Sequence, residues 1–186
     1  MSALAEPSGS TFAVRPLDPF NDTVLVHRWV THPGAAFRPV RGVRLQDAER
    51  ECMAIAAHPH HDAFIGLHDG EPAFLMERYD PAEAGLKGLY EAEPGDVGMR
   101  FLVAPTDTGM PGRTPAVLTT VLEALFADPA VRRVVVDADA RDSTAHALHG
   151  SVGFEALRVI GRPEKSALLS ACTRDRFQAA TAGVHR

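Results

Sequence analysis

Cysteine is scarce in this chain of 186 residues, which has only Cys52 and Cys172, far apart and in no C-x-x-C spacing. This argues against a disulfide framework and against a cysteine-rich metal site. Long apolar runs are also missing, so no stretch is suited to crossing a membrane. The first ten residues lack a basic segment followed by an apolar one, which gives no support for secretion. We therefore expect a cytoplasmic protein.

Clusters of lysine and arginine are missing as well, and the net charge is −5. A nucleic-acid-binding protein more often has a basic face, so nucleic acid is not an expected partner. The acidic excess suits a small cationic substrate, but it suits solubility better. Length and composition indicate one α/β domain over residues 11–180, between a disordered tail (1–10) and a C-terminal tail (181–186).

Apolar periodicity predicts the order of the elements. Strands are expected at 11–16, 62–68, 72–79, 97–104, 132–138, 155–160 and 166–173. Helices are expected at 22–30, 45–57, from Thr114 onward, 144–152 and 174–180, with a loop and a short helix within 80–94. Single helices between the later strands indicate a mixed sheet. The dipeptide Asp69-Gly70 is a tight-turn signal.

A loop with two glycines and a proline, residues 106–113, opens onto the helix that Thr114 and Pro115 begin. Threonine suits the N-cap and proline suits the first helical position. The unpaired N–H groups of a helix start can bind a pyrophosphate. Such strand–loop–helix units are common, so this one alone does not identify a function.

The stretch Asp137–Phe154 (DADARDSTAHALHGSVGF) resembles the GNAT acyltransferase superfamily, in which a strand, an Arg-Asn pair and a helix ending in Gly-Phe recur beside acyl-CoA. Further segments follow in an order similar to that of the siderophore branch, including the acyltransferases of desferrioxamine biosynthesis. These segments are 27–33, 58–61, 74–79, 90–99 and 163–169. The resemblance runs from Phe12 to about Phe177.

This resemblance implies a GNAT fold, with a mixed central sheet splayed at the acyl-CoA cleft and helices on both faces. It implies transfer of an acetyl or succinyl group from acyl-CoA to an N-hydroxylated diamine such as N-hydroxycadaverine, which forms a hydroxamate. No metal is implied. The assembly is left open between a monomer and a homodimer.

The resemblance also implies roles for single residues. The catalytic pair maps to His60 and Asp96, with His58 and His61 close enough to His60 to compete for its role. Acyl-CoA is expected to contact Phe101, Leu102, Val103, Gly109, Gly112, Arg113 and Thr114. The acceptor is expected to contact Trp29, Glu77, Tyr79 and Tyr90.

Three positions depart from the family pattern. Arg38 stands where an aromatic residue is common, the phosphate loop is degraded within 109–115, and Asp142 replaces asparagine. These departures leave open altered specificity, weaker CoA binding or neutral drift.

A base of modest strength suits the chemistry, because a hydroxylamine nitrogen is much less basic than a lysine-like amine and is largely neutral at pH 7. Histidine is suitable for this task. No nucleophilic residue is required, and Cys52 lies in a core-facing helical stripe. Three other readings stay open: a GNAT enzyme for another small amine, a GNAT-fold module that binds acyl-CoA without turnover, and a metal protein built on His58, His60 and His61.

Overall fold

The computed structural model describes residues 2–5, 11–33, 42–105, 113–163 and 165–182. The chain divides into two compact units. The first comprises Met1–Arg78 and Arg100–Thr120, and the second comprises Tyr79–Met99 and Val121–Arg186. The single domain predicted over 11–180 stays a prediction, and each unit is described by itself.

The first unit contains the strands β1 (Ser2–Ala5), β2 (Thr11–Pro16), β3 (His61–His68), β4 (Glu71–Tyr79) up to Arg78, and the second half of β5 (Asp96–Val103). They are neighbours in the order β1-β2-β3-β4-β5. The expected disorder of residues 1–10 needs a correction, because Ser2–Ala5 pair antiparallel with β2. This pairing occupies N–H and C=O groups that an edge strand would leave open.

The turn between β3 and β4 confirms the Asp-Gly signal. Asp69 has φ 53° and Gly70 has φ 87°, so both central residues are in the left-handed region. Such a turn matches the twist of antiparallel strands and therefore makes β3 and β4 a hairpin.

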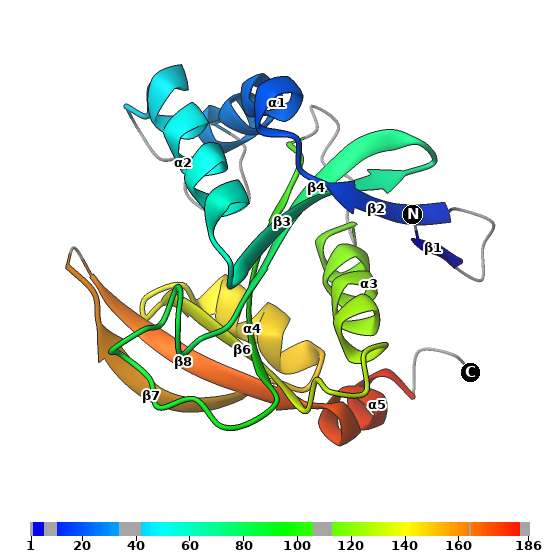
Figure 1. The fold of residues 1–186 in the computed structure, drawn as a ribbon. Coiled ribbons are helices and arrows are strands. Elements are labelled where there is room, and N and C mark those ends of the chain that lie inside the picture. Colours follow the sequence, from blue (N-terminus) through cyan, green and yellow to red (C-terminus); the bar gives the residue numbers. More distant parts are fainter. Residues whose placement is uncertain (1, 6–10, 34–41, 106–112, 164, 183–186) are drawn as a thin grey trace. The chain divides into compact units, whose positions relative to one another are not determined.

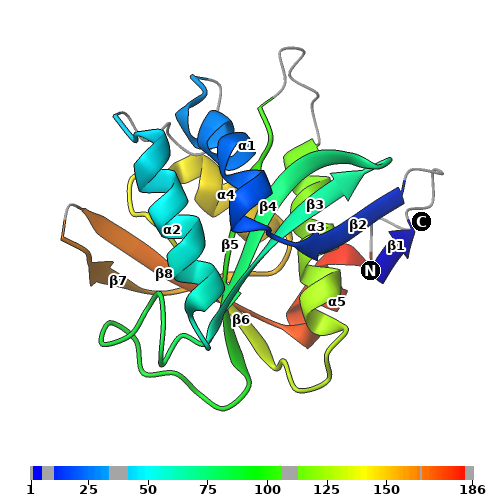
Figure 2. The same ribbon diagram turned by 45° about the horizontal axis from the view of Figure 1, so that its top comes forward.

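Two helices, α1 (Pro19–Thr31) and α2 (Leu45–Ala57), lie side by side in the first unit (Figures 1 and 2). Helix α1 begins before the predicted residue 22, because the Asp18 carboxylate accepts a hydrogen bond from the Phe20 amide and Pro19 takes the first turn. The buried stripes of both helices join the sheet in one core cluster. Its buried members are Val26, Trp29, Cys52, Ile65, Leu75 and Ala104.

The second unit contains the first half of β5, then β6 (Arg133–Asp139), β8 (Ser166–Thr173) and β7 (Glu155–Gly161) in this order. β5 and β6 are parallel, whereas β6–β8 and β7–β8 are antiparallel, so the sheet is mixed as predicted. The ladder between β5 and β6 pairs Asp96–Gly98 with Arg133–Val135. A ladder this short is what a sheet splayed between these strands requires.

Helices α4 (Ser143–Ser151) and α5 (Arg174–Thr181) belong to the second unit, and α3 (Arg113–Phe126) contributes residues to both. Helix α4 begins at Ser143, one residue before the predicted start, because the Asp142 carboxylate caps it and accepts a hydrogen bond from the Ala145 amide. No helix forms within residues 80–94, contrary to expectation. This segment instead makes turns that bury Leu86 completely.

Candidate functional site

Three charged or titratable side chains meet on adjacent strands of the first unit. Nε2 of His61, at the start of β3, lies 3.1 Å from Oε2 of Glu77 on β4. Nη1 of Arg100 on β5 lies 3.9 Å from the same oxygen. The side chains of His61 and Glu77 are only 10% and 16% exposed. A carboxylate held against one ring nitrogen fixes the orientation of an imidazole, which is the arrangement that general-base catalysis uses.

The other two histidines of the segment lie differently. His58 is the C-cap of α2, and its Nδ1 accepts a hydrogen bond of 3.1 Å from the backbone amide of His60. Both His58 and His60 are exposed. The helix end and Pro59 thus turn the chain, and His61, unlike His58 and His60, belongs to strand β3.

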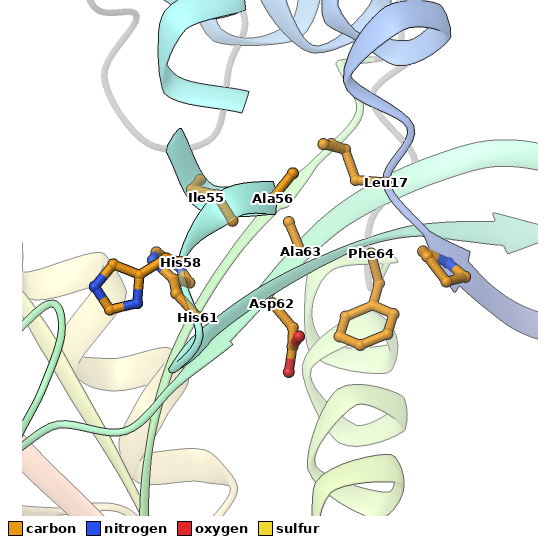
Figure 3. Close-up of a pocket in the computed structure, with 9 residues that line it drawn as sticks. Leu17, Ile55, Ala56, His58, His61, Asp62, Ala63 and Phe64 are labelled. Atoms are coloured by element: carbon orange, nitrogen blue, oxygen red, sulfur yellow. The ribbon is translucent and has the colours of Figure 1, made fainter. Parts of the chain in front are cut away.

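A cavity of about 230 Å³ opens beside His61 in the first unit (Figure 3). Most of its lining is apolar, and its polar members are His58, His61 and Asp62. The apolar members are Pro16, Leu17, Ile55, Ala56, Ala63 and Phe64. Figure 3 shows the imidazoles of His58 and His61 together at one end. Asp62 is paired with Arg78 at 3.0 Å.

The second unit holds the other member of the predicted catalytic pair. The carboxylate of Asp96 is 1% exposed and forms an ion pair with Arg133 at 2.8 Å. It also accepts hydrogen bonds from the Tyr90 hydroxyl at 2.7 Å and from the Glu93 amide at 2.9 Å. Burial opposes ionisation of Asp96, but these donors outweigh it and lower its pKa. An anion satisfied in this way is poorly suited to accept a proton.

The other predicted acceptor contacts lie in different surroundings. Burial and the bond to Asp96 raise the pKa of Tyr90, which keeps its hydroxyl a donor. Trp29 is packed in the core of the first unit and Tyr79 in that of the second. The Tyr79 ring lies over Gly98, where a β-carbon would come within 2.1 Å of it. Both aromatic rings therefore serve packing, and their contact with a substrate stays a prediction.

Only some of the residues expected to bind acyl-CoA lie in the part of the chain that the structure describes. Phe101, Leu102 and Val103 form the second half of β5 in the first unit. Helix α3 begins at Arg113, so Thr114 lies inside its first turn and is not the cap. Gly109 and Gly112 lie outside the described residues, as does Arg38.

The predicted approach of His60 to Asp96 joins residues of different units and stays a prediction. Sequence reasoning missed the pairing of His61 with Glu77. The hairpin gave a signal for it, because His61 precedes Asp69 by about as many residues as Glu77 follows Gly70. It also missed Arg133, the partner of Asp96, for which the sequence gives no local signal.

The described residues contain neither a metal-binding cluster nor a membrane-spanning helix. No three or more His, Cys, Asp or Glu side chains are arranged to hold a metal ion, and the histidines of 58–61 form no such group. Within the same residues, no helix is long and apolar enough to cross a membrane.

A sequence model of the acetyltransferase (GNAT) domain matches residues 18–161 of the chain. The chain is also 28% identical over 146 residues to the lysine N-acyltransferase MbtK of Mycobacterium sp. (strain MCS), covering 78% of this chain and 58% of that protein. It is 27% identical to the putative O-acetyltransferase SAT14 of Stachybotrys chartarum, covering 91% of this chain and 38% of that one. The chain thus spans little more than half of the first relative and less of the second.

Solved structures share the fold at low sequence identity. An uncharacterised protein of Bacillus halodurans superposes with a TM-score of 0.86 at 18% identity, covering 97% of this chain and 94% of that one. The aminoglycoside acetyltransferase AAC(6')-Ib, in complex with ribostamycin and coenzyme A, superposes with a TM-score of 0.74 at 20% identity. That match covers 90% of this chain and 96% of the other.

Proposed function

The chain belongs to the acetyltransferase (GNAT) family, and we propose that it transfers an acyl group from acyl-CoA to a nitrogen of a small amine. The observation that carries this proposal is the family match across residues 18–161, which includes His61, Glu77 and Arg100. The relative named lysine N-acyltransferase supports nitrogen as the acceptor atom.

The acceptor we propose is an N-hydroxylated diamine resembling N-hydroxycadaverine, so that the product is a hydroxamate of siderophore biosynthesis. Several sequence segments between residues 27 and 169 support this choice, since they follow one another in the same order as in the siderophore branch and resemble it. The chemistry supports it too, because a hydroxylamine nitrogen attacks without first losing a proton at pH 7. An imidazole of the segment 58–61 then needs only to take the proton that the nitrogen releases on acylation.

The proposed co-substrate is acetyl-CoA or succinyl-CoA. Its pantetheine arm would run along Phe101–Val103, and its pyrophosphate would lie at the start of α3. The N-terminal end of a helix favours negative charge, and Arg113 in the first turn adds a cation there. Solved structures of the same fold contain CoA or acetyl-CoA, which supports this kind of ligand.

A CoA-release assay on the full chain tests the proposal. The acceptors are N-hydroxycadaverine, cadaverine, N-hydroxylysine, spermidine and ribostamycin, each with acetyl-CoA and with succinyl-CoA. We expect the highest kcat/KM with an N-hydroxylated acceptor. A preference for an unhydroxylated amine would show that the acceptor is not an N-hydroxylated diamine. Binding of acyl-CoA without release of CoA with any acceptor would favour a module that binds acyl-CoA without turnover.

A further inference from the structure

We propose that the cavity beside β3 is the acceptor-amine site and that His61, oriented by Glu77, is its general base; this inference rests on the proposed N-acyltransferase function. Within the segment 58–61, His61 lies 3.1 Å from a carboxylate oxygen of Glu77, and its side chain is mostly withdrawn from water. An imidazole that is fixed and partly desolvated can present one nitrogen to a substrate in a constant direction.

The contact with Glu77 also selects the nitrogen that acts. A neutral imidazole carries one proton, and a carboxylate can only accept a hydrogen bond. Nε2 of His61 therefore carries the proton and donates a hydrogen bond to Glu77, whereas Nδ1 carries the lone pair. Nη1 of Arg100 lies 3.9 Å from the same Glu77 oxygen and forms an ion pair with it, which helps to hold the carboxylate in place beside His61. Glu77 is a positioning residue, because it acts through His61.

The reaction balances with these groups. The hydroxylamine nitrogen forms a bond to the thioester carbonyl carbon, and the carbon–sulfur bond breaks. The proton released by the nitrogen passes to Nδ1 of His61 and then to the CoA thiolate. The products are a hydroxamic acid with one acyl group on its nitrogen, free CoA and the neutral imidazole, so no oxidant or metal is consumed.

The cavity fits a short aliphatic amine. Its volume of about 230 Å³ is roughly that of eight water molecules at about 30 Å³ each, and N-hydroxycadaverine has five carbons, two nitrogens and one oxygen. Six of the nine lining residues are apolar, which suits a polymethylene chain, and His61 forms part of the wall. The reacting nitrogen would therefore lie at the imidazole while the chain fills the rest of the cavity.

Ala56 offers a way to test the cavity without disturbing the core. It is an exposed residue near the end of α2 that lines the cavity, whereas its neighbour Ala57 is exposed and does not line it. Leucine is well tolerated in helices, so both Ala56→Leu and Ala57→Leu should fold. We expect Ala56→Leu to raise KM for the amine by tenfold or more without raising KM for acyl-CoA. Ala57→Leu should change neither.

Steady-state CoA release by the full chain, with amine and acyl-CoA varied separately, tests the base. We expect His61→Gln to lower kcat by about 10²–10⁴-fold and to abolish the decline of kcat/KM on acidification that an imidazole base imposes. Glu77→Gln should lower kcat at least tenfold with little change in KM. The matched control is Glu71→Gln, an exposed glutamate of the same strand, which should behave like the wild type. Circular dichroism confirms that each variant is folded.

The possible results distinguish a failure of the base assignment from a failure of the proposed N-acyltransferase function. Turnover of amines by the wild type, with His61→Gln within threefold of it, would overturn the base assignment and leave the proposed function intact. A larger loss in His60→Ala than in His61→Gln would return the role to His60. A rise in KM for acyl-CoA instead of the amine in Ala56→Leu would show that the cavity holds the acyl group. Absence of turnover by the wild type with every amine would overturn the proposed function and this inference with it.

Discussion

Replacing Asp96 by alanine should destabilise the fold more than it affects chemistry. The change removes a carboxylate that is 1% exposed and leaves the Arg133 guanidinium, which is 19% exposed, without its main partner. Removing one member of a buried ion pair typically costs about 3–5 kcal/mol of unfolding free energy. Arg133 is partly exposed and keeps an ion pair with Glu93 at 2.9 Å, which offsets a small part of the cost, so we expect a loss near the lower end, about 3 kcal/mol.

Urea unfolding followed by circular dichroism measures this loss at pH 7 for the wild type, Asp96→Ala, Arg133→Met and the double variant. The double variant should be less destabilised than the sum of the singles, because it leaves no unpaired charge. The lowered pKa of Asp96 fixes the pH window: its contribution is complete above the usual Asp pKa of about 3.9 and is lost as the pH falls further. A loss below about 1 kcal/mol together with a tenfold fall in kcat would refute this reasoning and restore Asp96 as a catalytic residue.

Two further predictions concern the second unit. Burial, with His146 adding to it, lowers the pKa of His149 to about 4; the unfolded chain binds this proton near pH 6.5, so stability should fall by about 3 kcal/mol from pH 6.5 to 4. Urea unfolding across this range should show a smaller loss in His149→Leu, and an equal loss would contradict the assignment. Gly98→Ala should cost about 1–3 kcal/mol or more, since its β-carbon would lie 2.1 Å from the buried Tyr79 ring. Gly161→Ala, with open space around it, is the control, and equal midpoints for both variants would count against the clash.

Local signals in the sequence were enough to predict the elements whose causes are themselves local. The helix over 45–57 follows from its apolar stripe, and the turn at Asp69-Gly70 follows from the conformations these two residues tolerate. Where neighbouring polar residues could each cap a helix, the sequence did not show which of them is the N-cap. The cap of α4 proved to be Asp142, and α1 begins under the cap of Asp18.

Contacts between distant residues account for most of what was missed. Residues 2–5 have little strand character of their own and become β1 through pairing with β2. Asp96 and Arg133 lie 37 positions apart and meet because β5 and β6 run parallel. The sequence did mark both the histidine segment and Glu77 as site candidates. It could not show that His61 and Glu77 are partners, since that depends on the register of the hairpin.

The central claim, acyl transfer to a hydroxylamine nitrogen, is tested most directly by identifying the product formed by the full chain from N-hydroxycadaverine and acetyl-CoA or succinyl-CoA. Mass spectrometry gives the number of acyl groups added, and the coloured ferric complex distinguishes a hydroxamate from an ester of the hydroxyl oxygen. The account predicts one acyl group, release of one CoA for each product, and a positive ferric test. An O-acylated product without the ferric colour, or no product with either acyl donor, would contradict it.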